Sequence, residues 1–558
     1  MRSGFWARAR QRLDAVGRLD HTVAQPGELP ADEGHDLRIV VGDEDGPPAP
    51  GAGLISHAPT LSGAAVGCQA WRATSESDGG GRMTSAGLRL AGALLALTVL
   101  ACGGNNGYVP DAGCPECDAG YQDDGGNPEA GLCFGDIPCA PAQVRQPAAA
   151  CQSAGANQSF VVSTAPHSDG YPETSLALPA VGARVKDPGF GTCVTRATPR
   201  GWMNGYSRFT AFNADSSKLL ARQSGGAWYL LDYDSLGTPT HDLPAYGDDA
   251  APRWHGRDPD VLFYLDGTTL QRYQVSTSAA TVALDVADAA ALQGCSIDSI
   301  SLGGSEGEAS AGSRFWGFQV VTAGTCHGGL NHFVTADLET GEMWTHTLPS
   351  GVDMPDNSSM SLTGKYFIAN FQGQGCSGGG TMAQPCGVMA YLRRFESATL
   401  VHEDAGHHDE ALSKEGHDVV VVKSNSTDYI EAVDVETGQL TTIAAMNLDA
   451  QAWDYHVSGN NWAAPGWVLL SEDSYDTSGH YLSRQIAAVE LKGMAGARVV
   501  HLAHHRTRST EYWTQEPHAS VNADFTRVAF HSNWYGGADE SENILFFLEL
   551  PPGFLDHL

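Results

Sequence analysis

The sequence predicts an all-β protein built as a seven-bladed β-propeller, and two observations carry that prediction. The first is a strand–turn–strand unit that is clearest at residues 511–534, where the turn Asn522-Ala523-Asp524 precedes an alternating run at 527–531. The second is the recurrence of this unit roughly every 40–50 residues, with no long apolar stripe at helical spacing after residue 150. A short β unit repeated at this period is typical of a propeller, in which each unit forms one blade.

The repeat can be followed through the chain by its turns. The first unit contains the same turn, Asn213-Ala214-Asp215, and the third and fifth units carry Asp-x-Glu-Thr-Gly at residues 337–341 and 434–438. The Asp-x-Glu-Thr-Gly turns occupy matching places in their two units, which favours a true repeat over coincidence. We count seven units, and counts of six or eight stay open because the second and sixth units have irregular insertions. The units lie at about residues 209–243, 253–284, 306–348, 357–401, 407–443, 456–502 and 518–550.

Ahead of the repeats, residues 83–102 have the pattern of a bacterial lipoprotein signal peptide. Arg89 supplies a short basic start, and an apolar run too short to span a bilayer ends in Val-Leu-Ala-Cys, with Cys102 as the acylated residue. The alternative is a short buried helix. The 82 residues before this segment show no periodicity, so we interpret residues 1–82 as a disordered, non-native extension, with Met83 as the true start. The lipobox predicts a bacterial cell-envelope protein, anchored by lipid at the outer membrane or cell surface.

Between the lipobox and the propeller lies a segment whose composition predicts a disordered tether. Gly, Pro, Asp and Ala dominate residues 103–150, which therefore have too little apolar surface to order themselves. The propeller domain is placed at residues 151–558. A lead-in at residues 185–192 precedes the first unit.

Ten cysteines follow the lipobox, and an even number in an exported chain suggests disulfides. Cys376 and Cys386 are expected to staple one loop. Cys114 and Cys117 have the spacing of half a zinc site, but the sequence offers no second pair at that spacing, which favours disulfides for them as well.

The charge of the chain limits its partners. The formal net charge is −33, and a nucleic-acid-binding protein needs a basic face, so nucleic acid is excluded as a partner. Contact with a membrane is expected only through the lipid anchor.

One mouth of the propeller channel is predicted to gather several polar residues. The innermost strand of each blade lines the channel, so residues that begin these strands converge there although they lie far apart in sequence. Three successive units place a histidine at this position. The residues expected at this mouth are Glu306, Asn357, His407 or His408, His456, Gln515, Glu516 and His518.

Strand parity weakly distinguishes the two neighbouring histidines of the fifth unit. His518 lies seven residues before Phe525 at its turn, and His407 lies nine residues before Gly416, which is the same parity. His408 has the opposite parity, so the spacing favours His407 without deciding the matter.

Imidazoles and a carboxamide on one concave surface suit a divalent transition metal such as Mn²⁺ or Zn²⁺. The alternative is a set of ordinary polar residues that cap a water network in the channel.

The repeat plan, with Gln515-x-x-His518 and the upstream histidines, resembles the oligogalacturonate lyases, a family of seven-bladed propeller enzymes, over roughly residues 185–550. The resemblance implies that His456, Gln515 and His518 are ligands of a metal, with Mn²⁺ favoured. It implies that His407 or His408 is the catalytic histidine.

The chain departs from that family at one ligand. The family has a further histidine two residues beyond the position of His518, and this chain has Ser520 there. Glu516 is an additional candidate, since its carboxylate could supply an oxygen ligand.

The resemblance implies β-elimination of uronic-acid glycans by a surface-anchored lyase, with an acidic oligosaccharide as partner. The competing hypothesis is a non-catalytic propeller lipoprotein that binds a glycan or a protein. Cations are needed to hold a uronate, and the candidates are Arg393, Arg394, Arg484, Arg506 and Arg508.

Other motifs are interpreted as unrelated to function. Residues 303–307 and 375–379 match G-x-S-x-G, but that motif needs a preceding strand and a following helix, which neither place predicts. The stretch at 501–508 is expected to be a solvated loop between blades.

Overall fold

The computed structural model of the protein describes residues 132–138, 145–147, 160–164, 171–246, 252–323, 328–372, 376, 379–427, 429–445, 454–473, 481–508, 513–537 and 539–558. The described residues belong to one compact unit. The extension at 1–82, the signal segment with Cys102, and the Cys114 and Cys117 pair lie outside the described residues. In the described part of the chain, no helix is long and apolar enough to cross a membrane.

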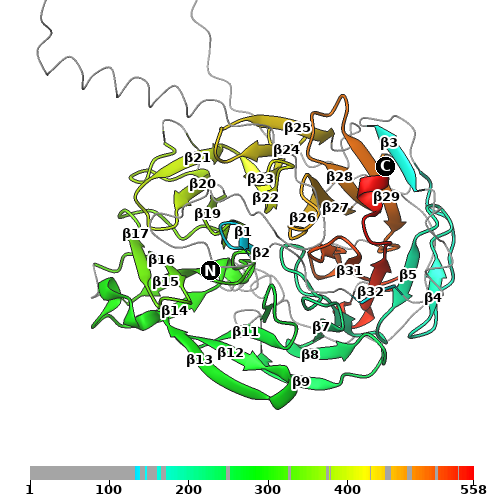
Figure 1. The fold of residues 1–558 in the computed structure, drawn as a ribbon, viewed down its shortest axis with the longest axis horizontal. Coiled ribbons are helices and arrows are strands. Elements are labelled where there is room, and N and C mark those ends of the chain that lie inside the picture. Colours follow the sequence, from blue (N-terminus) through cyan, green and yellow to red (C-terminus); the bar gives the residue numbers. More distant parts are fainter. Residues whose placement is uncertain are drawn as a thin grey trace, which may run out of the picture. The chain divides into compact units, whose positions relative to one another are not determined.

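Seven antiparallel sheets follow one another around a ring, as Figure 1 shows in a view down its axis. Five sheets have four strands and two have five. The predicted seven-bladed, all-β propeller is therefore confirmed, and the only helices among the described residues are short 3-10 turns. They are η1 (Val275–Thr277), η2 (Val286–Asp288), η3 (Ala290–Leu292), η4 (Gly303–Ser305), η5 (Trp513–Gln515), η6 (Glu540–Glu542) and η7 (Phe554–His557).

The first five blades use strands that follow one another in sequence. These strands are β6 (Trp202–Met203), β7 (Lys218–Gln223), β8 (Ala227–Asp232) and β9 (His241–Tyr246); β10 (Arg253–Trp254), β11 (Val261–Asp266), β12 (Thr269–Gln274) and β13 (Ala279–Asp285); β14 (Ile297–Ser301), β15 (Phe315–Thr322), β16 (His332–Asp337) and β17 (Met343–Thr347); β18 (Asn357–Met360), β19 (Tyr366–Phe371), β20 (Gly387–Leu392) and β21 (Ala398–His402); β22 (Ala405–Leu412), β23 (Asp418–Ser424), β24 (Tyr429–Asp434) and β25 (Leu440–Ala445).

The last two blades take strands from both ends of the described chain. Blade six has the order β26 (Asp454–Ser458), β27 (Trp467–Asp473), β28 (Gln485–Glu490), β29 (Arg498–His504) and β3 (Val161–Thr164). Blade seven has the order β30 (Ser520–Val521), β31 (Arg527–Ser532), β32 (Ile544–Glu549), β5 (Cys193–Arg196) and β4 (Arg184–Lys186).

This arrangement corrects two expectations about the ends of the repeat. The seventh unit supplies only three strands, and the segment expected as a lead-in contributes β4 and β5 to that same blade. Joining the two ends of the chain in one sheet closes the ring and covers the edge that β32 would otherwise expose.

The stretch 501–508 is not the solvated loop that the sequence predicts. Its first half belongs to β29, and His501, His505 and Arg506 are fully buried.

The core of the protein lies between neighbouring blades. The middle strands β31 and β32 are buried along their whole length, as expected for strands packed on both faces. Val421 of blade five packs with Leu470 of blade six, and Leu219 of blade one packs with Phe547 of blade seven. The closed ring therefore has no blade without a partner on each side.

The repeated turn predicted from the sequence has one structural cause. Asn522 Oδ1 accepts a hydrogen bond of 2.9 Å from the backbone N–H of Arg527, and Asn213 Oδ1 accepts one of 2.9 Å from that of Lys218. Both bonds close the connection between the first and second strands of a blade. The turn thus fixes the register of the inner hairpin in blades one and seven.

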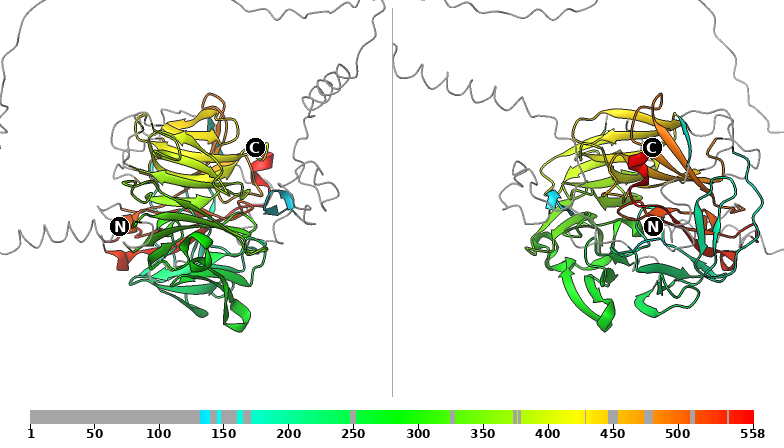
Figure 2. Two further views of the ribbon diagram at one scale, coloured as in Figure 1. Left: turned by 90° about the vertical axis from the view of Figure 1, so that its left-hand side faces the viewer. Right: turned by 45° about the vertical axis from the view of Figure 1, so that its right-hand side comes forward.

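A short hairpin, β1 (Leu132–Phe134) and β2 (Ile137–Pro138), lies over the centre of the ring in Figure 1 and projects from one face in the side view of Figure 2. It falls within residues 103–150, which the sequence predicts to be a tether, and residues 132–138 of that segment are ordered in the structure. The buried Asp136 donates its N–H to Thr363 O at 3.0 Å and accepts hydrogen bonds from the Ser310 hydroxyl and the Arg314 N–H. These tertiary contacts order the hairpin, although the composition of residues 103–150 does not predict an ordered structure.

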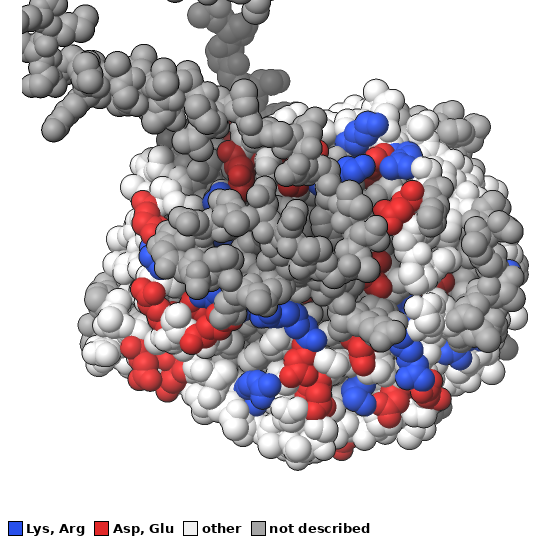
Figure 3. All heavy atoms as spheres, viewed as in Figure 1, with Lys and Arg blue, Asp and Glu red and all other residues white. Residues whose placement is uncertain are grey.

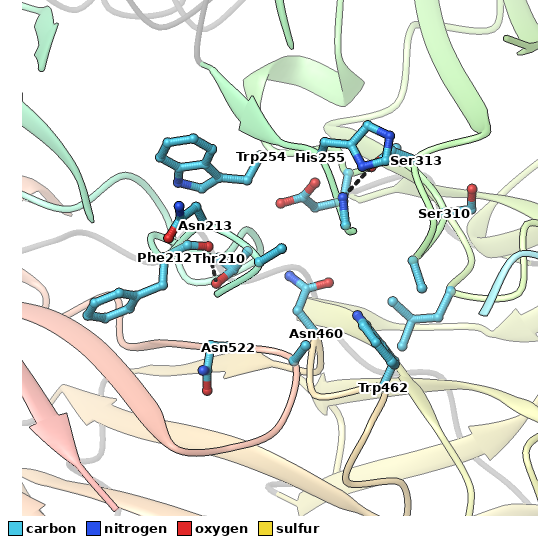
Figure 4. A pocket seen from close by; sticks show the side chains of 17 residues that line it. Thr210, Phe212, Asn213, Trp254, His255, Ser310, Ser313, Asn460, Trp462 and Asn522 are labelled. Atoms are coloured by element: carbon cyan, nitrogen blue, oxygen red, sulfur yellow. Dashed lines mark hydrogen bonds between the residues drawn. The ribbon is translucent and has the colours of Figure 1, made fainter. Parts of the chain in front are cut away.

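The hairpin closes one mouth of the channel, which we call the lower mouth. Ile137 packs in a cluster with Ala311, Leu362, Leu412 and Trp462, which come from four different blades. Beside this cluster is a cavity of about 50 Å³, and Figure 4 shows Asn213, Asn460 and Asn522 among its lining side chains. A buried water needs roughly 10–15 Å³ of such space, so the cavity has room for a few waters and not for a sugar ring.

Candidate metal centre

The opposite mouth of the channel, which we call the upper mouth, holds the predicted histidines. His407 lies near the start of β22 and His456 near the start of β26, while His518 follows η5 and precedes β30. β22 ends at Leu412, which packs against the hairpin at the lower mouth. The two mouths are therefore separated by the length of the innermost strands, at about 3.3 Å per residue.

His456, Glu516 and His518 meet at the upper mouth. Their ligand atoms all lie within 4.8 Å of one another. Glu516 Oε2 lies 2.6 Å from His456 Nε2 and 3.4 Å from His518 Nε2, and the two imidazole rings are 4.4 Å apart and perpendicular. A carboxylate oxygen thus sits between two imidazoles contributed by neighbouring blades.

Electrostatic interactions favour the metal-binding forms of Glu516 and His518. Burial opposes ionisation of Glu516, but hydrogen bonds from His456 and His518 outweigh burial and hold the pKa of Glu516 well below its usual range. Burial, followed by the nearby His456, lowers the pKa of His518 to about 4, although Glu516 opposes this. At neutral pH the site therefore offers an ionised carboxylate and a neutral His518, the forms that bind a metal.

The backbone of His518 is held in an unusual conformation. Its φ is +42°, in the left-handed region that non-glycine residues rarely adopt. Its carbonyl accepts a hydrogen bond of 2.7 Å from Asn204 Nδ2, and Asn204 Oδ1 lies 2.7 Å from His531 Nδ1. The His531 ring is 5.2 Å from that of His518. This buried support holds the His518 ring beside Glu516.

Two further oxygens near the trio have no hydrogen-bond partner among the described residues. They are Gln515 Oε1 and Ser520 Oγ, and both residues are fully buried. Gln515 Nε2 donates to Gly537 O at 3.3 Å, which leaves the carbonyl end of this carboxamide as an acceptor that needs a donor or a cation.

The donor set fits a divalent cation. Two imidazoles, one carboxylate and one carboxamide oxygen form a mixed nitrogen and oxygen set, which suits Mn²⁺ or Zn²⁺. A His–metal bond is roughly 2.1 Å, so atoms within 4.8 Å of one another need only small side-chain shifts to share one ion. His456, Gln515, Glu516 and His518 would hold it.

The structure separates the two histidines of blade five. The half-buried His407 stacks on His456, with ring centroids 4.5 Å apart, and its Nδ1 lies 3.2 Å from Tyr455 O. Since a carbonyl only accepts, this contact assigns the proton to Nδ1 and leaves Nε2 as the basic nitrogen.

His408 points into the channel instead. It is fully buried, its Nε2 lies 2.8 Å from Arg208 Nη2, and its Nδ1 lies 3.3 Å from Asn370 Nδ2. Burial, followed by the charge of Arg208, holds the pKa of His408 well below its usual value. His408 is therefore a partner of Arg208, and only His407 belongs to the upper mouth.

Two residues of the first blade complete the channel below the trio, and sequence reasoning missed both. The Tyr206 ring lies 4.7 Å from that of His518 and 5.3 Å from that of His456, so it forms a floor. Arg208 lies within 4 Å of three carboxylates, those of Glu306, Asp409 and Glu410. Tyr206 lies just ahead of the first unit as counted from the sequence, at 209–243, and no residue type there signalled a site.

Glu306 and Asn357, also predicted at the channel, do lie along it, but they are not part of the trio. Glu306 contacts Arg208 at 3.8 Å, and Asn357 begins β18 as a buried residue whose Oδ1 has no partner among the described residues. They line the channel and do not reach the three ligand atoms.

The candidate arginines divide between the two faces. Arg393 and Arg394 follow the end of β20, whose Leu392 pairs with Tyr366 at the lower side of the ring. Arg484, Arg506 and Arg508 lie at the upper side, because β29 ends where His504 pairs with Gln485, next to the start of β28. Figure 3 shows acidic and basic side chains interspersed on the described part of the lower face, with no extended basic patch visible there.

The loop cysteines take the predicted geometry. Cys376 and Cys386 lie with their Cα atoms 5.3 Å apart and their sulfurs joined, within the usual range for a disulfide.

No family model matches the chain, and no curated protein is similar to it in sequence. Among solved structures, the fold is similar to that of an oligogalacturonate lyase in complex with manganese, at 16% identity and a TM-score of 0.45, covering 69% of this chain and 99% of that one. It is also similar to an oligogalacturonate lyase from Vibrio parahaemolyticus, at 14% identity, a TM-score of 0.48, and coverage of 66% and 96%. The WD40 domain of Pan2 from Neurospora crassa matches at 12% identity and a TM-score of 0.36, covering 64% of this chain and 95% of that domain. Propellers with different names share this fold, so a function must be argued from the site itself.

Proposed function

We propose that this protein is a metal-assisted polysaccharide lyase that cleaves uronic-acid glycans by β-elimination. The observation that carries the proposal is the trio His456, Glu516 and His518, whose ligand atoms lie within 4.8 Å of one another at the upper mouth of the channel. A divalent cation there would be held by these residues and Gln515, and we propose Mn²⁺ as the first ion to test. When bound, such a cation stabilises negative charge that develops on a substrate carboxylate.

The reaction then needs a base beside the site, and His407 fits that role. Its ring is stacked on His456 and its Nε2 is the basic nitrogen. In β-elimination, Nε2 removes the C5 proton, which lies α to the uronate carboxylate. The electrons of that C–H bond form the C4–C5 double bond, and the C4–O bond breaks. The departing oxygen takes up a proton from water, and the protonated His407 returns its proton to the solvent, so the charge balances.

The proposal includes a place for the enzyme. We propose that Cys102 carries a lipid, that the protein is anchored in the bacterial cell envelope, and that its partner there is an acidic glycan. The support is the lipobox at residues 99–102.

The competing function is a propeller that binds a glycan without cleaving it. One observation favours it: Ser520 replaces a histidine ligand that the oligogalacturonate lyases have. Glu516 argues against it, because its carboxylate supplies a charged ligand between the two histidines.

A two-step experiment tests the proposal. The purified protein is loaded with Mn²⁺ or Zn²⁺, dialysed and analysed for metal, and it is then screened on uronic-acid polymers by the ultraviolet absorbance of the unsaturated product. One bound ion per chain and metal-dependent product are expected. A protein that binds metal and glycan but gives no product is a binding propeller, and a protein that binds no divalent ion refutes the proposed centre.

A further inference from the structure

Three arginines gather beside the metal centre, at the upper end of blades six and seven. Two of them are neutralised inside the protein. Arg506 pairs with Asp187 at 2.8 Å and both are fully buried, while Arg484 pairs with Glu173 at 3.0 Å and donates to Thr507 O at 2.8 Å. These two guanidinium groups hold the N-terminal segment against the blades.

The third, Arg508, differs in its surroundings. Its side chain is exposed, and no carboxylate of the described residues lies within ion-pair distance of it. It is also close to the other two, since burial and then the charges of Arg508 and Arg506 lower the pKa of Arg484, against the opposing Glu173 and Glu472. In a chain with a net charge of −33, an exposed and unneutralised guanidinium beside two others is an attractive place for an anion.

The backbone of Arg508 is fixed to the loop that carries the metal centre. Asn533 Oδ1 accepts from the Arg508 N–H at 2.8 Å, and Asn533 Nδ2 donates to Arg508 O at 2.8 Å. The same Nδ2 donates to Gly537 O at 3.2 Å, and Gly537 O also accepts from the candidate ligand Gln515 at 3.3 Å. One loop therefore positions both Arg508 and Gln515.

An aromatic side chain lies beside the two neutralised arginines, Arg484 and Arg506. The N–H of Tyr535 donates to Arg506 O at 3.0 Å, and Tyr535 is held at a φ of +62°, a conformation that non-glycine residues rarely adopt. Its half-buried ring lies 5.7 Å from the Arg484 guanidinium. An exposed ring edge beside an arginine can pack on the apolar face of a sugar while the arginine binds a carboxylate.

We propose that Arg508 and Tyr535 form a second sugar subsite, which binds the carboxylate of the uronate next to the one at the metal centre. This inference rests on the proposed function and makes it more specific: the substrate is an oligosaccharide with at least two adjacent acidic sugars. Arg508 supplies a planar guanidinium that can bind a carboxylate through two hydrogen bonds. Tyr535 sets the position of the sugar ring.

The test compares Arg508→Ala with wild type on a uronic-acid oligomer and on the same oligomer methyl-esterified only at the sugar assigned to Arg508. Losing the charge-assisted hydrogen bonds between Arg508 and the substrate carboxylate should raise KM for the acid by about 10- to 100-fold. The values of kcat and metal content should not change. On the methyl ester the two proteins should behave alike. Arg508→Lys should recover part of the affinity, since it keeps the charge. Arg394→Ala is the matched control, an exposed arginine on the opposite face, and it should leave KM unchanged.

The outcomes separate this inference from the proposed function. If the wild type cleaves the acid and Arg508→Ala has the same KM, or loses affinity equally for the methyl ester, the subsite is refuted while the lyase stands. If the wild type neither cleaves nor binds any oligouronate, as followed by calorimetry with Mn²⁺ present, both proposals fall.

Discussion

The two mouths of the channel are built from the same repeated unit, yet they differ in chemistry. At the upper mouth, His456, Glu516 and His518 converge around a common centre, and His518 has a strained backbone. At the lower mouth, the chain covers its own channel with Asp136 and Ile137, which pack against several blades.

The difference teaches where this fold places function and where it places stability. Strained residues and buried acceptors without partners persist only where surrounding structure over-determines them, and they cluster at sites that bind ligands. At the lower mouth the chain mainly contacts itself, through the apolar cluster around Ile137 and the hydrogen bonds made by the N–H and Oδ2 of Asp136. We therefore expect substitutions at the upper mouth to change binding and chemistry, and substitutions at the lower mouth to change stability.

The largest expected effect concerns catalysis at the upper mouth. Replacing His407 by Ala removes the basic Nε2 but none of the three ligand atoms at the centre, so elimination should fall by about two to four orders of magnitude while metal content is kept. Steady-state rates on a uronic-acid polymer, with metal analysis of the same preparation, measure this. Loss of metal together with activity would show that His407 is a ligand.

The second-largest expected effect is a loss of metal affinity. Replacing His518 by Ala should weaken binding of Mn²⁺ by more than about 100-fold, because even residues that only orient a ligand contribute 10- to 100-fold. Titration with Mn²⁺ followed by calorimetry gives the affinity. His417→Ala is the control, since His417 pairs with Asp434 away from the centre. Equal Mn²⁺ affinities for His518→Ala and wild type would show that His518 is not a ligand of the metal.

The lower mouth should respond in stability alone. A Cβ at Gly312 would lie 2.3 Å from Asp136 Oδ1 and 2.6 Å from Asp136 O, so Gly312→Ala must displace the hairpin. We expect a loss of about 1–3 kcal/mol in the free energy of unfolding, with unchanged affinity for metal. Gly493→Ala, where a Cβ meets nothing within 4 Å, is the control for denaturant unfolding. A hairpin variant with altered metal affinity would break the distinction between the mouths.

The smallest effect is a pH dependence of opposite sign at the two mouths. His518 has a pKa lowered to about 4, so the unfolded chain takes up its proton first as pH falls, and the contribution of His518 is full above 6.5 and declines below it. Burial raises the pKa of Asp136, so its contribution is full at low pH and is lost as pH rises through the folded pKa.

Hydrogen exchange of metal-free protein measures both trends. From pH 6.5 to 5.5, protection around His518 should fall by no more than about 1.4 kcal/mol, the value of one pKa unit. Protection of the hairpin should not fall over the same interval. Asp136→Asn, which has no charge to titrate, should remove the trend at the lower mouth only, and parallel trends at both mouths would contradict the assignment.

The class of fold and most of the residues at the upper mouth can be predicted from local sequence patterns. The turn at Asn522 is a local hydrogen bond over five residues, so it can be recognised wherever it recurs, and counting such turns gives the blades. Since every blade begins at the same mouth, the positions of His456 and His518 in their units were enough to predict that they meet.

Which of the two neighbouring histidines joins them depends on contacts between distant parts of the chain. His407 and His408 are adjacent residues of the same type. The structure distinguishes them through Arg208, which lies 200 residues away in the sequence and holds His408 in the channel. The place of Glu516 between the histidines, the docking of the hairpin and the closure of blade seven by β4 and β5 likewise depend on contacts between distant segments. Local periodicity reports which face a residue occupies, but it carries no information about which distant side chain will meet it there.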